Sequence, residues 1–235
     1  MDKSWLWLVI AIGNTRIRAV VFNRDRQIIK EYAYAHKDLP SLEIELTNQQ
    51  FAKISIFSVV ANLVTYWHRL AQTQIITTAD IPLQNLYANL GVDRALAAFG
   101  AGELYGYPLL VIDAGTALTL TGVDAQKNLV GGAIIAGLRS QFITLHQNTS
   151  ALPNISIPEY LPDRWANNTN SAIESGIAYI FLYGLQAYID DWRSQFPDSH
   201  IILTGGDGDR LKQWGLKIDV LDSYLVFWGV WHCQF

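Results

Sequence analysis

The sequence contains very little cysteine and comparatively little charge. Of its 235 residues only Cys233 is a cysteine, and charged side chains make up 16% of the chain. A single cysteine cannot form a disulfide or a CxxC metal site within one chain, so a disulfide-stapled fold is excluded and a reduced compartment is expected. Half of the residues are hydrophobic, which is enough for a large buried core and excludes a disordered chain.

The sequence also lacks a hydrophobic run long enough to cross a membrane. The apolar segment near the N-terminus spans only residues 5–12, whereas a transmembrane helix needs about 20 apolar residues. The basic start and small-residue cleavage site of a secretory signal are missing as well. We therefore predict a buried strand in this segment, a cytoplasmic location and no membrane partner.

Neither a basic stripe nor a histidine pair with metal-ligand spacing is present. The 17 lysines and arginines are outnumbered by 21 aspartates and glutamates, which gives a net charge of −4. This acidic balance argues against a nucleic-acid partner. An anionic ligand would therefore have to be held by a few local groups rather than by the overall charge.

A pattern of strand, glycine turn and strand occurs twice and predicts a duplicated α/β fold. The first copy has Gly13-Asn14-Thr15 between the apolar runs 6–12 and 17–22, which is typical of a hairpin. The second has a turn at 113–116 between the runs 109–112 and 117–123, and the two copies are offset by 102 positions (113 minus 11). We expect two lobes, residues 1–108 and 109–235, with a central cleft that can close over a substrate.

Hydrophobic periodicity predicts the remaining elements. Further strands are expected at 27–34, 53–60, 74–78, 128–135 and 201–203. Helices are expected at 42–49, 63–72, 93–105, 138–147 and 171–192. The proline-containing segment 149–168 is predicted to be irregular, and 224–230 fits either a strand or a helix.

Both glycine turns have the composition of a phosphate-binding loop. We call Gly13-Asn14-Thr15 the first glycine turn and Gly115-Thr116 the second glycine turn. A tight turn of this kind exposes backbone N–H groups and a hydroxyl with no bulky side chain in the way. One glycine hairpin is typical of an ordinary turn, but two at equivalent places favour a shared role.

Asp113 is the first candidate for a catalytic residue. It follows the fully apolar run 109–112 and directly precedes the second glycine turn. A carboxylate at such a place can accept a proton from a substrate hydroxyl or hold a metal ion. An aspartate that stabilises the turn through its own side chain is equally compatible with this local pattern.

Two more segments contain candidate binding residues. In Gly91-Val92-Asp93-Arg94, Asp93 is typical of a helix cap, whereas Arg94 has the chemistry to pair with a carboxylate or a phosphate. In Thr204-Gly205-Gly206, the glycines follow a strand and allow a flat ring or a ribose to lie against the backbone. An ordinary strand-to-helix turn would have the same composition.

Taken together, these segments resemble type III pantothenate kinases, because the matching pieces occur in the family's order over nearly the whole chain. They are Gly13-Asn14-Thr15, Ser58-Val59-Val60, Tyr87, Gly91-Val92-Asp93-Arg94, Asp113-x-Gly115-Thr116-Ala117, Gly131-Gly132-x-Ile134-x-x-Gly137, Leu152-Pro153, Thr169-x-x-Ala172-Ile173-x-x-Gly176, Thr204-Gly205-Gly206 and Leu225-Val226-x-x-Gly229. The ordered set is far more specific than any one piece.

The resemblance implies an actin-like ATPase fold with two ribonuclease-H-like lobes. It implies ATP-dependent phosphorylation of pantothenate, the first step toward coenzyme A, by a homodimer that uses magnesium and a monovalent cation, potassium or ammonium. By the same resemblance, Asp113 is the general base. The pantothenate-binding positions are Tyr87, Gly91, Asp93, Arg94 and Thr169. The ATP-binding positions are Gly13, Asn14, Thr15, Arg18, Gly115, Thr116, Gly205 and Gly206.

The sequence departs from the family pattern at a few positions. Ala11 stands where the family has an aspartate that serves the metal–phosphate end of ATP, and Thr121 stands where the family has an aspartate at the monovalent-cation site. Asp124 is close to Thr121 but out of register, and it is the remaining candidate metal ligand. Two alternatives stay open: a catalytically impaired regulatory or binding protein on the same fold, and a kinase for another small alcohol.

Overall fold

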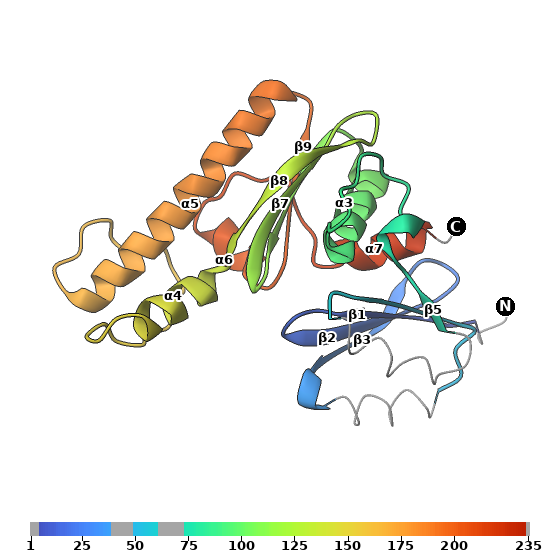
Figure 1. Ribbon diagram of the computed structural model, residues 1–235, viewed down its shortest axis with the longest axis horizontal. Coiled ribbons are helices and arrows are strands. Elements are labelled where there is room, and N and C mark those ends of the chain that lie inside the picture. The colour runs from blue at the N-terminus through green and yellow to red at the C-terminus, as the bar shows by residue number, and fades with distance from the viewer. Residues whose placement is uncertain (1–4, 39–48, 61–72, 234–235) are drawn as a thin grey trace. The chain divides into compact units, whose positions relative to one another are not determined.

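The computed structural model describes residues 5–38, 49–60 and 73–233 (Figure 1). The helices predicted at 42–49 and 63–72 lie outside these residues, apart from position 49. The chain divides into two compact units. The first comprises 1–82, 86–100 and 226–235, and the second comprises 83–85 and 101–225.

The first unit is built on a sheet of five strands in the order β3-β2-β1-β4-β5. β1 pairs antiparallel with β2 and parallel with β4. The sheet is therefore antiparallel on the β2 side of β1 and parallel on the β4 side. The strands are β1 (Trp7–Ile12), β2 (Arg16–Phe22), β3 (Ile28–Ala35), β4 (Lys53–Ser58) and β5 (Thr73–Ile75).

The second unit repeats this sheet strand for strand. Read from its hairpin edge, its order is β8-β7-β6-β9-β10, which matches the order of the first sheet. The irregularity in register falls at the same place in both copies, between Val21 and Phe22 and between Gly122 and Val123. The predicted duplication is therefore confirmed. The strands are β6 (Leu109–Ala114), β7 (Ala117–Val123), β8 (Leu129–Ala136), β9 (His200–Thr204) and β10 (Val220–Leu221).

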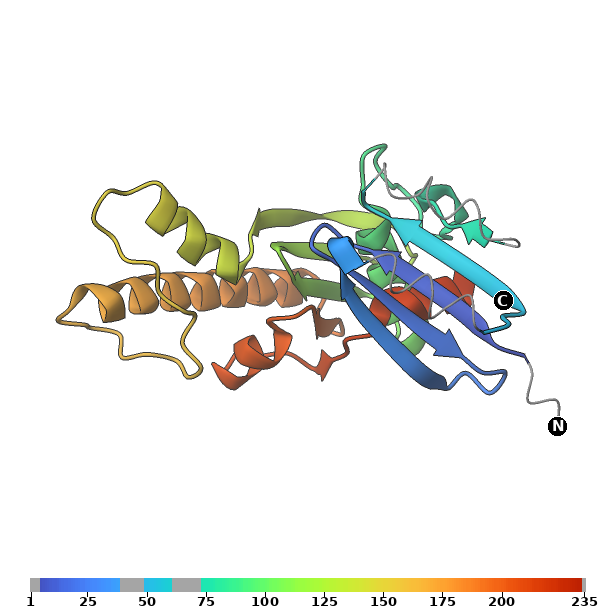
Figure 2. The ribbon, with the colours of Figure 1, turned by 90° about the horizontal axis from the view of Figure 1, so that it is seen from below.

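The helices of the described chain are η1 (His36–Asp38), η2 (Thr78–Asp80), α3 (Val92–Tyr105), α4 (Leu138–Gln147), α5 (Thr169–Gln195), α6 (Gly208–Gln213) and α7 (Leu225–Cys233). The three longest of these helices, α3, α4 and α5, follow from the apolar periodicity of the sequence. The predictions of helices at 93–105, 138–147 and 171–192 are confirmed. In both views α4 lies beside the N-terminal half of α5 (Figure 1, Figure 2). No helix of the described chain is both long and apolar enough to span a bilayer.

Each unit buries its own hydrophobic core. In the second unit, α5 covers the sheet with buried side chains such as Phe181 and Leu185, which join the core residues of β6 and β7. In the first unit, the ambiguous segment 224–230 is the helix α7, which places Trp231 against Trp7 with ring centroids 5.1 Å apart. These aromatic contacts explain why most of α7 groups with the first unit and not with the predicted lobe 109–235.

Candidate active site

Asp113 lies at the end of a buried strand of the second unit. β6 runs through Ala114, two residues further than the apolar run suggests, so the connection to β7 is only the second glycine turn. Asp113 pairs with Thr119 of β7 on one side and with Thr204 of β9 on the other. Its side chain is half-buried, whereas Thr116 in the turn is exposed.

Gly205 brings the end of β9 directly against Asp113. It has a φ of +91°, and a Cβ atom there would lie 2.5 Å from Asp113 Oδ1 and 2.6 Å from Ala114 N. Two residues later, the Asp207 N–H donates to the Ala114 carbonyl at 3.0 Å. Only glycine fits both this backbone conformation and this close approach. The carboxylate therefore faces a strip of backbone without a side chain.

Gly137 supports the second glycine turn from the start of α4. Its N–H donates to the Thr116 carbonyl at 2.9 Å, and the hydroxyl of Ser140 donates to the same oxygen at 2.9 Å. A Cβ atom on Gly137 would overlap the Gly115 carbonyl oxygen and lie 2.7 Å from that of Thr116. The Thr116 carbonyl of the turn is thus held by two donors from the start of α4.

The first glycine turn connects the equivalent strands of the first unit and is one residue longer, Gly13-Asn14-Thr15 between β1 and β2. The Gly13 N–H donates to the Arg16 carbonyl at 3.0 Å, and the Asn14 and Thr15 side chains are exposed. Ala11 pairs across β2 with Arg18, just as Asp113 pairs across β7 with Thr119. Ala11 is therefore the structural equivalent of Asp113, and this turn has no carboxylate at the matching place.

Arg18 is engaged by a neighbouring strand. Its Nη2 lies 2.7 Å from Glu31 Oε1, and its Nε donates to the same oxygen at 3.2 Å. The guanidinium also lies 5.3 Å from the ring centroid of Phe227. The ion pair is about one-third exposed on both sides, so water screens it. Arg18 thus lies beside the first glycine turn with its charge partly balanced.

Tyr87, Asp93 and Arg94 come together in the first unit, and we call them the arginine cluster. Arg94 is 8% exposed, and its Nη1 donates to the Tyr87 hydroxyl at 2.7 Å. Asp93 lies in the first turn of α3, which begins at Val92, so it is not the helix cap; its Oδ1 accepts the Arg94 N–H at 2.8 Å. Burial raises the pKa of Asp93, and the Arg94 backbone and charge offset part of that rise.

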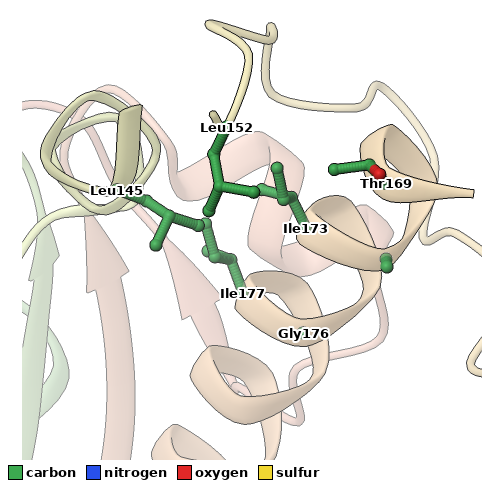
Figure 3. Close-up of a pocket in the computed structure, with 7 residues that line it drawn as sticks. Leu145, Leu152, Thr169, Ile173, Gly176 and Ile177 are labelled. Carbon is green, nitrogen blue, oxygen red and sulfur yellow. The ribbon is translucent and has the colours of Figure 1, made fainter. Parts of the chain in front are cut away.

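Thr169 belongs to the second unit, where it is the first residue of α5. The helix is capped by Asn168, whose side chain accepts the Ser171 N–H at 3.0 Å. Thr169 lies at one end of an otherwise apolar hollow of about 490 Å³ between α4 and α5 (Figure 3). Its other lining residues are Leu145, Leu152, Ala172, Ile173, Gly176 and Ile177.

The carboxylate of Asp124 is occupied within the β7–β8 turn. Its Oδ1 accepts the N–H groups of Gln126 at 2.9 Å and Asn128 at 2.8 Å, and the Asn128 amide donates to both carboxylate oxygens. Desolvation raises the pKa of Asp124, but these hydrogen bonds outweigh it and hold the pKa below its ordinary value. Among the residues that the structure describes, no three His, Cys, Asp or Glu side chains gather as a metal site.

Two polar residues at the site were not singled out from the sequence. His36 contacts the first glycine turn, with its Nε2 2.8 Å from the Gly13 carbonyl oxygen across 23 positions of sequence. Asp207 follows the Gly205 turn and binds Arg210 at 3.0 Å, while burial raises its pKa. Neither residue belongs to a local pattern that could have identified it.

Known proteins resemble this chain over almost its whole length. The family model described as Type III pantothenate kinase matches residues 7–191. A Type III pantothenate kinase of Synechocystis is 40% identical and aligns over 97% of this chain and 90% of its own length. One of Gloeobacter violaceus is 35% identical, with 96% of both chains covered.

Solved structures share the fold at low sequence identity. A conserved Campylobacter jejuni protein assigned to the Baf family of transcriptional activators has a TM-score of 0.67 at 20% identity, with 96% of both chains covered. A Sinorhizobium meliloti protein described as a 2-dehydro-3-deoxygalactonokinase has a TM-score of 0.62 at 11% identity, with 97% of this chain and 95% of that one covered. The fold is that of the actin-like ATPases and sugar kinases.

Proposed function

The chain belongs to the type III pantothenate kinase family, and on this basis we propose that it transfers the γ-phosphoryl group of ATP to the primary alcohol of pantothenate. This is the first step toward coenzyme A. The single cysteine agrees with a cytoplasmic location.

The observation that carries the mechanism is the place of Asp113, between Gly205 and the second glycine turn. We propose that its carboxylate accepts the proton of the pantothenate alcohol as the oxygen attacks the γ-phosphorus. The bond from that phosphorus to the β,γ-bridging oxygen then breaks, and ADP leaves. Phosphoryl transfer depends mainly on positioning and charge stabilisation. A single protein base beside a phosphate-binding turn is therefore enough for the proton transfer.

The two glycine turns and the Gly205 turn supply the proposed ATP site. Gly137 and Ser140 hold the Thr116 carbonyl, which fixes the second glycine turn before a nucleotide arrives. Backbone N–H groups in such turns bind phosphate oxygens at close range. Gly206 leaves room for the nucleoside, because a Cβ atom there would meet nothing within 4 Å, whereas Gly205 is required by the close approach of β9 to Ala114.

Magnesium fits this donor set, whereas a carboxylate-bound monovalent cation does not. Mg²⁺ is commonly held by one or two carboxylates together with substrate phosphates and water, and Asp113 provides such a carboxylate. When bound with ATP, the ion neutralises phosphate charge. At the proposed monovalent-cation site, Thr121 is a buried hydroxyl and Asp124 is occupied in its turn. We therefore assign no step to potassium or ammonium.

The arginine cluster is the proposed site for the pantothenate carboxylate. A guanidinium that is buried and oriented by a hydroxyl is well suited to charge-assisted hydrogen bonds with a carboxylate. Tyr87 orients Arg94, and Gly91 allows Asp93 to approach, because a Cβ atom there would lie 2.5 Å from Asp93 Oδ1. For Thr169, in the second unit, a role in pantothenate binding is proposed on the family resemblance alone.

We also propose that the protein forms a homodimer through the second unit. An apolar face, made of Ile135 of β8 with Ile180 and Tyr188 of α5, is exposed along this unit, and Ile180 is 78% exposed. On the same helix an added Cβ at Gly176 or Gly184 would meet nothing within 4 Å, so another helix has room to approach closely. A second copy of the same face would cover these side chains in an isologous interface.

The test of the proposed reaction is Asp113→Asn. The amide cannot accept the alcohol proton, so kcat should fall by about 10²- to 10⁴-fold while pantothenate affinity and the unfolding midpoint stay close to wild type. Formation of phosphopantothenate from ATP and pantothenate is measured with purified protein, and binding is measured by calorimetry.

Asp198→Asn, at an exposed turn, is the matched control and should keep full turnover. Near-normal activity of Asp113→Asn would refute the base assignment. A wild-type protein that binds both ligands without forming product would instead support a catalytically impaired binding protein. Turnover of another alcohol in a substrate panel would point to a different kinase.

A further inference from the structure

His36 binds the backbone of the first glycine turn through its imidazole. Its Nε2 lies 2.8 Å from the Gly13 carbonyl oxygen. A carbonyl oxygen can only accept a hydrogen bond, so Nε2 must carry the proton and donate it. The Gly13 N–H is meanwhile bound to the Arg16 carbonyl at 3.0 Å. Both backbone groups of Gly13 are therefore fixed, one by the hairpin and one by this side chain.

The duplicated fold gives this contact a counterpart in the second unit. β3 ends at Ala35 and β8 ends at Ala136, so His36 and Gly137 are the residues that directly follow equivalent strands. Gly137 donates its N–H to the Thr116 carbonyl at 2.9 Å and so holds the second glycine turn. The same place in the repeat holds a turn carbonyl in both units, once through a backbone N–H and once through a side chain.

The first glycine turn depends on such support more than the second does. Ala11 provides no carboxylate for a metal ion, so this turn can offer ATP only its backbone N–H groups and the exposed side chains of Asn14 and Thr15. N–H groups bind phosphate well only when they are oriented before the ligand arrives. Otherwise the entropic cost of ordering them reduces the free energy of binding.

We infer that His36 is a positioning residue that holds the first glycine turn in its phosphate-binding conformation through the Nε2–Gly13 hydrogen bond. The inference rests on the proposed use of this turn for ATP. It concerns nucleotide affinity and leaves the chemical step to other residues.

The test compares His36→Leu with His36→Gln. Leucine removes the donor, so the Kd for a non-hydrolysable ATP analogue with magnesium, measured by calorimetry, should rise about three- to tenfold. In the kinetic assay the KM for ATP should rise similarly, with kcat and the pantothenate Kd close to wild type. The glutamine amide can donate to the same carbonyl and should restore most of the nucleotide affinity.

His146→Leu is the matched control. His146, in the last turn of α4, also makes an imidazole contact to a backbone carbonyl, that of Leu152 at 2.8 Å, but this carbonyl belongs to neither glycine turn. Its loss should leave the Kd of the ATP analogue unchanged. An unchanged Kd in His36→Leu would overturn the inference, and so would a glutamine variant that folds like wild type but binds as weakly as the leucine variant.

The binding measurement separates this inference from the proposed function. If the wild-type protein binds the ATP analogue but phosphorylates no pantothenate, the proposed function fails, and the Kd values still decide the role of His36. If the wild-type protein phosphorylates pantothenate and His36→Leu binds the analogue normally, only the inference fails.

Discussion

Ala11 and Asp113 show how much two equivalent positions can differ at the scale of a single residue. Both are fifth in the first strand of their unit, and both strands have the same sequence of buried and half-buried positions. Only the second unit has a carboxylate there. The proposed chemistry is therefore asymmetric, with the base in the second unit and only backbone N–H groups and the uncharged side chains of Asn14 and Thr15 at the first glycine turn.

Replacing Ala11 by aspartate should strengthen the binding of magnesium and ATP. The new carboxylate would offer an ATP-bound ion a ligand at the first glycine turn, and we expect a gain of about tenfold in affinity for the ATP analogue, or ~1.4 kcal/mol. Calorimetry with and without magnesium checks this, because the gain should appear only when magnesium is present.

Ala11→Asn is the matched control for that change, since it adds a similar side chain without the negative charge. It should not reproduce the gain. An unchanged or weaker affinity of Ala11→Asp would mean that the new carboxylate pairs with Arg18, which lies directly across the strand pair.

At the scale of elements, the site depends on three connections that meet in the second unit. The β6–β7 turn, the start of α4 and the end of β9 approach one another through Gly115, Gly137 and Gly205. At Gly137 and Gly205 the approach is closer than any larger residue would allow, whereas an added Cβ at Gly115 would come no closer than 3.4 Å to another atom. The elements are thus placed by backbone-to-backbone contact, and the side chain of Asp113 lies in the space that remains.

Gly137→Ala should disturb the second glycine turn. The added methyl group would overlap the Gly115 carbonyl oxygen, so α4 or the turn must move, which should cost about 1–3 kcal/mol of unfolding free energy and weaken binding of the ATP analogue. Urea denaturation and calorimetry measure the two effects.

Gly176→Ala provides the comparison, because its added methyl group meets no atom within 4 Å and lies within α5. Alanine is favoured over glycine inside a helix, so this variant should be as stable as wild type or up to about 1 kcal/mol more stable. If Gly137→Ala behaved in the same way, the proposed support of the turn by α4 would be wrong.

At the scale of the whole molecule, the apolar face of the second unit determines the expected assembly. Large side chains that remain this exposed on β8 and α5 are typical of an interface and not of a free surface. Because the face is part of a sheet edge and a long helix, two copies can pair without any change in the fold of either.

Ile180→Glu should convert the dimer to a monomer. A charge placed in the middle of the apolar face would be buried without a partner in the interface, at a cost that exceeds the lost apolar contact. Size-exclusion chromatography with light scattering measures the mass. Ile29→Glu changes another isoleucine that is more than half exposed, on β3 of the first unit, and should leave the dimer intact. A monomeric wild-type protein would contradict the proposal.

The sequence by itself determined most of the elements, and it supplied the candidates for the site residues. Runs such as 109–112 and 138–147 have the hydrophobic periodicity of a strand or a helix, which locates each element to within a few residues. The glycine turns repeat at a fixed offset. The order of motifs then identified the family, because each motif is a local property of the chain. Short elements such as α6 and β10 left no periodic signal and were not predicted.

Only the tertiary structure decided which distant residues touch. The contacts of His36 with Gly13, of Gly205 with Asp113 and of Trp231 with Trp7 join positions that no local pattern relates. A local contact decided the case of Asp124, whose carboxylate looked available in the sequence and is held by its own turn in the structure. Periodicity records which side of an element faces the core, whereas the partner on that side depends on how the strands are ordered in the sheet.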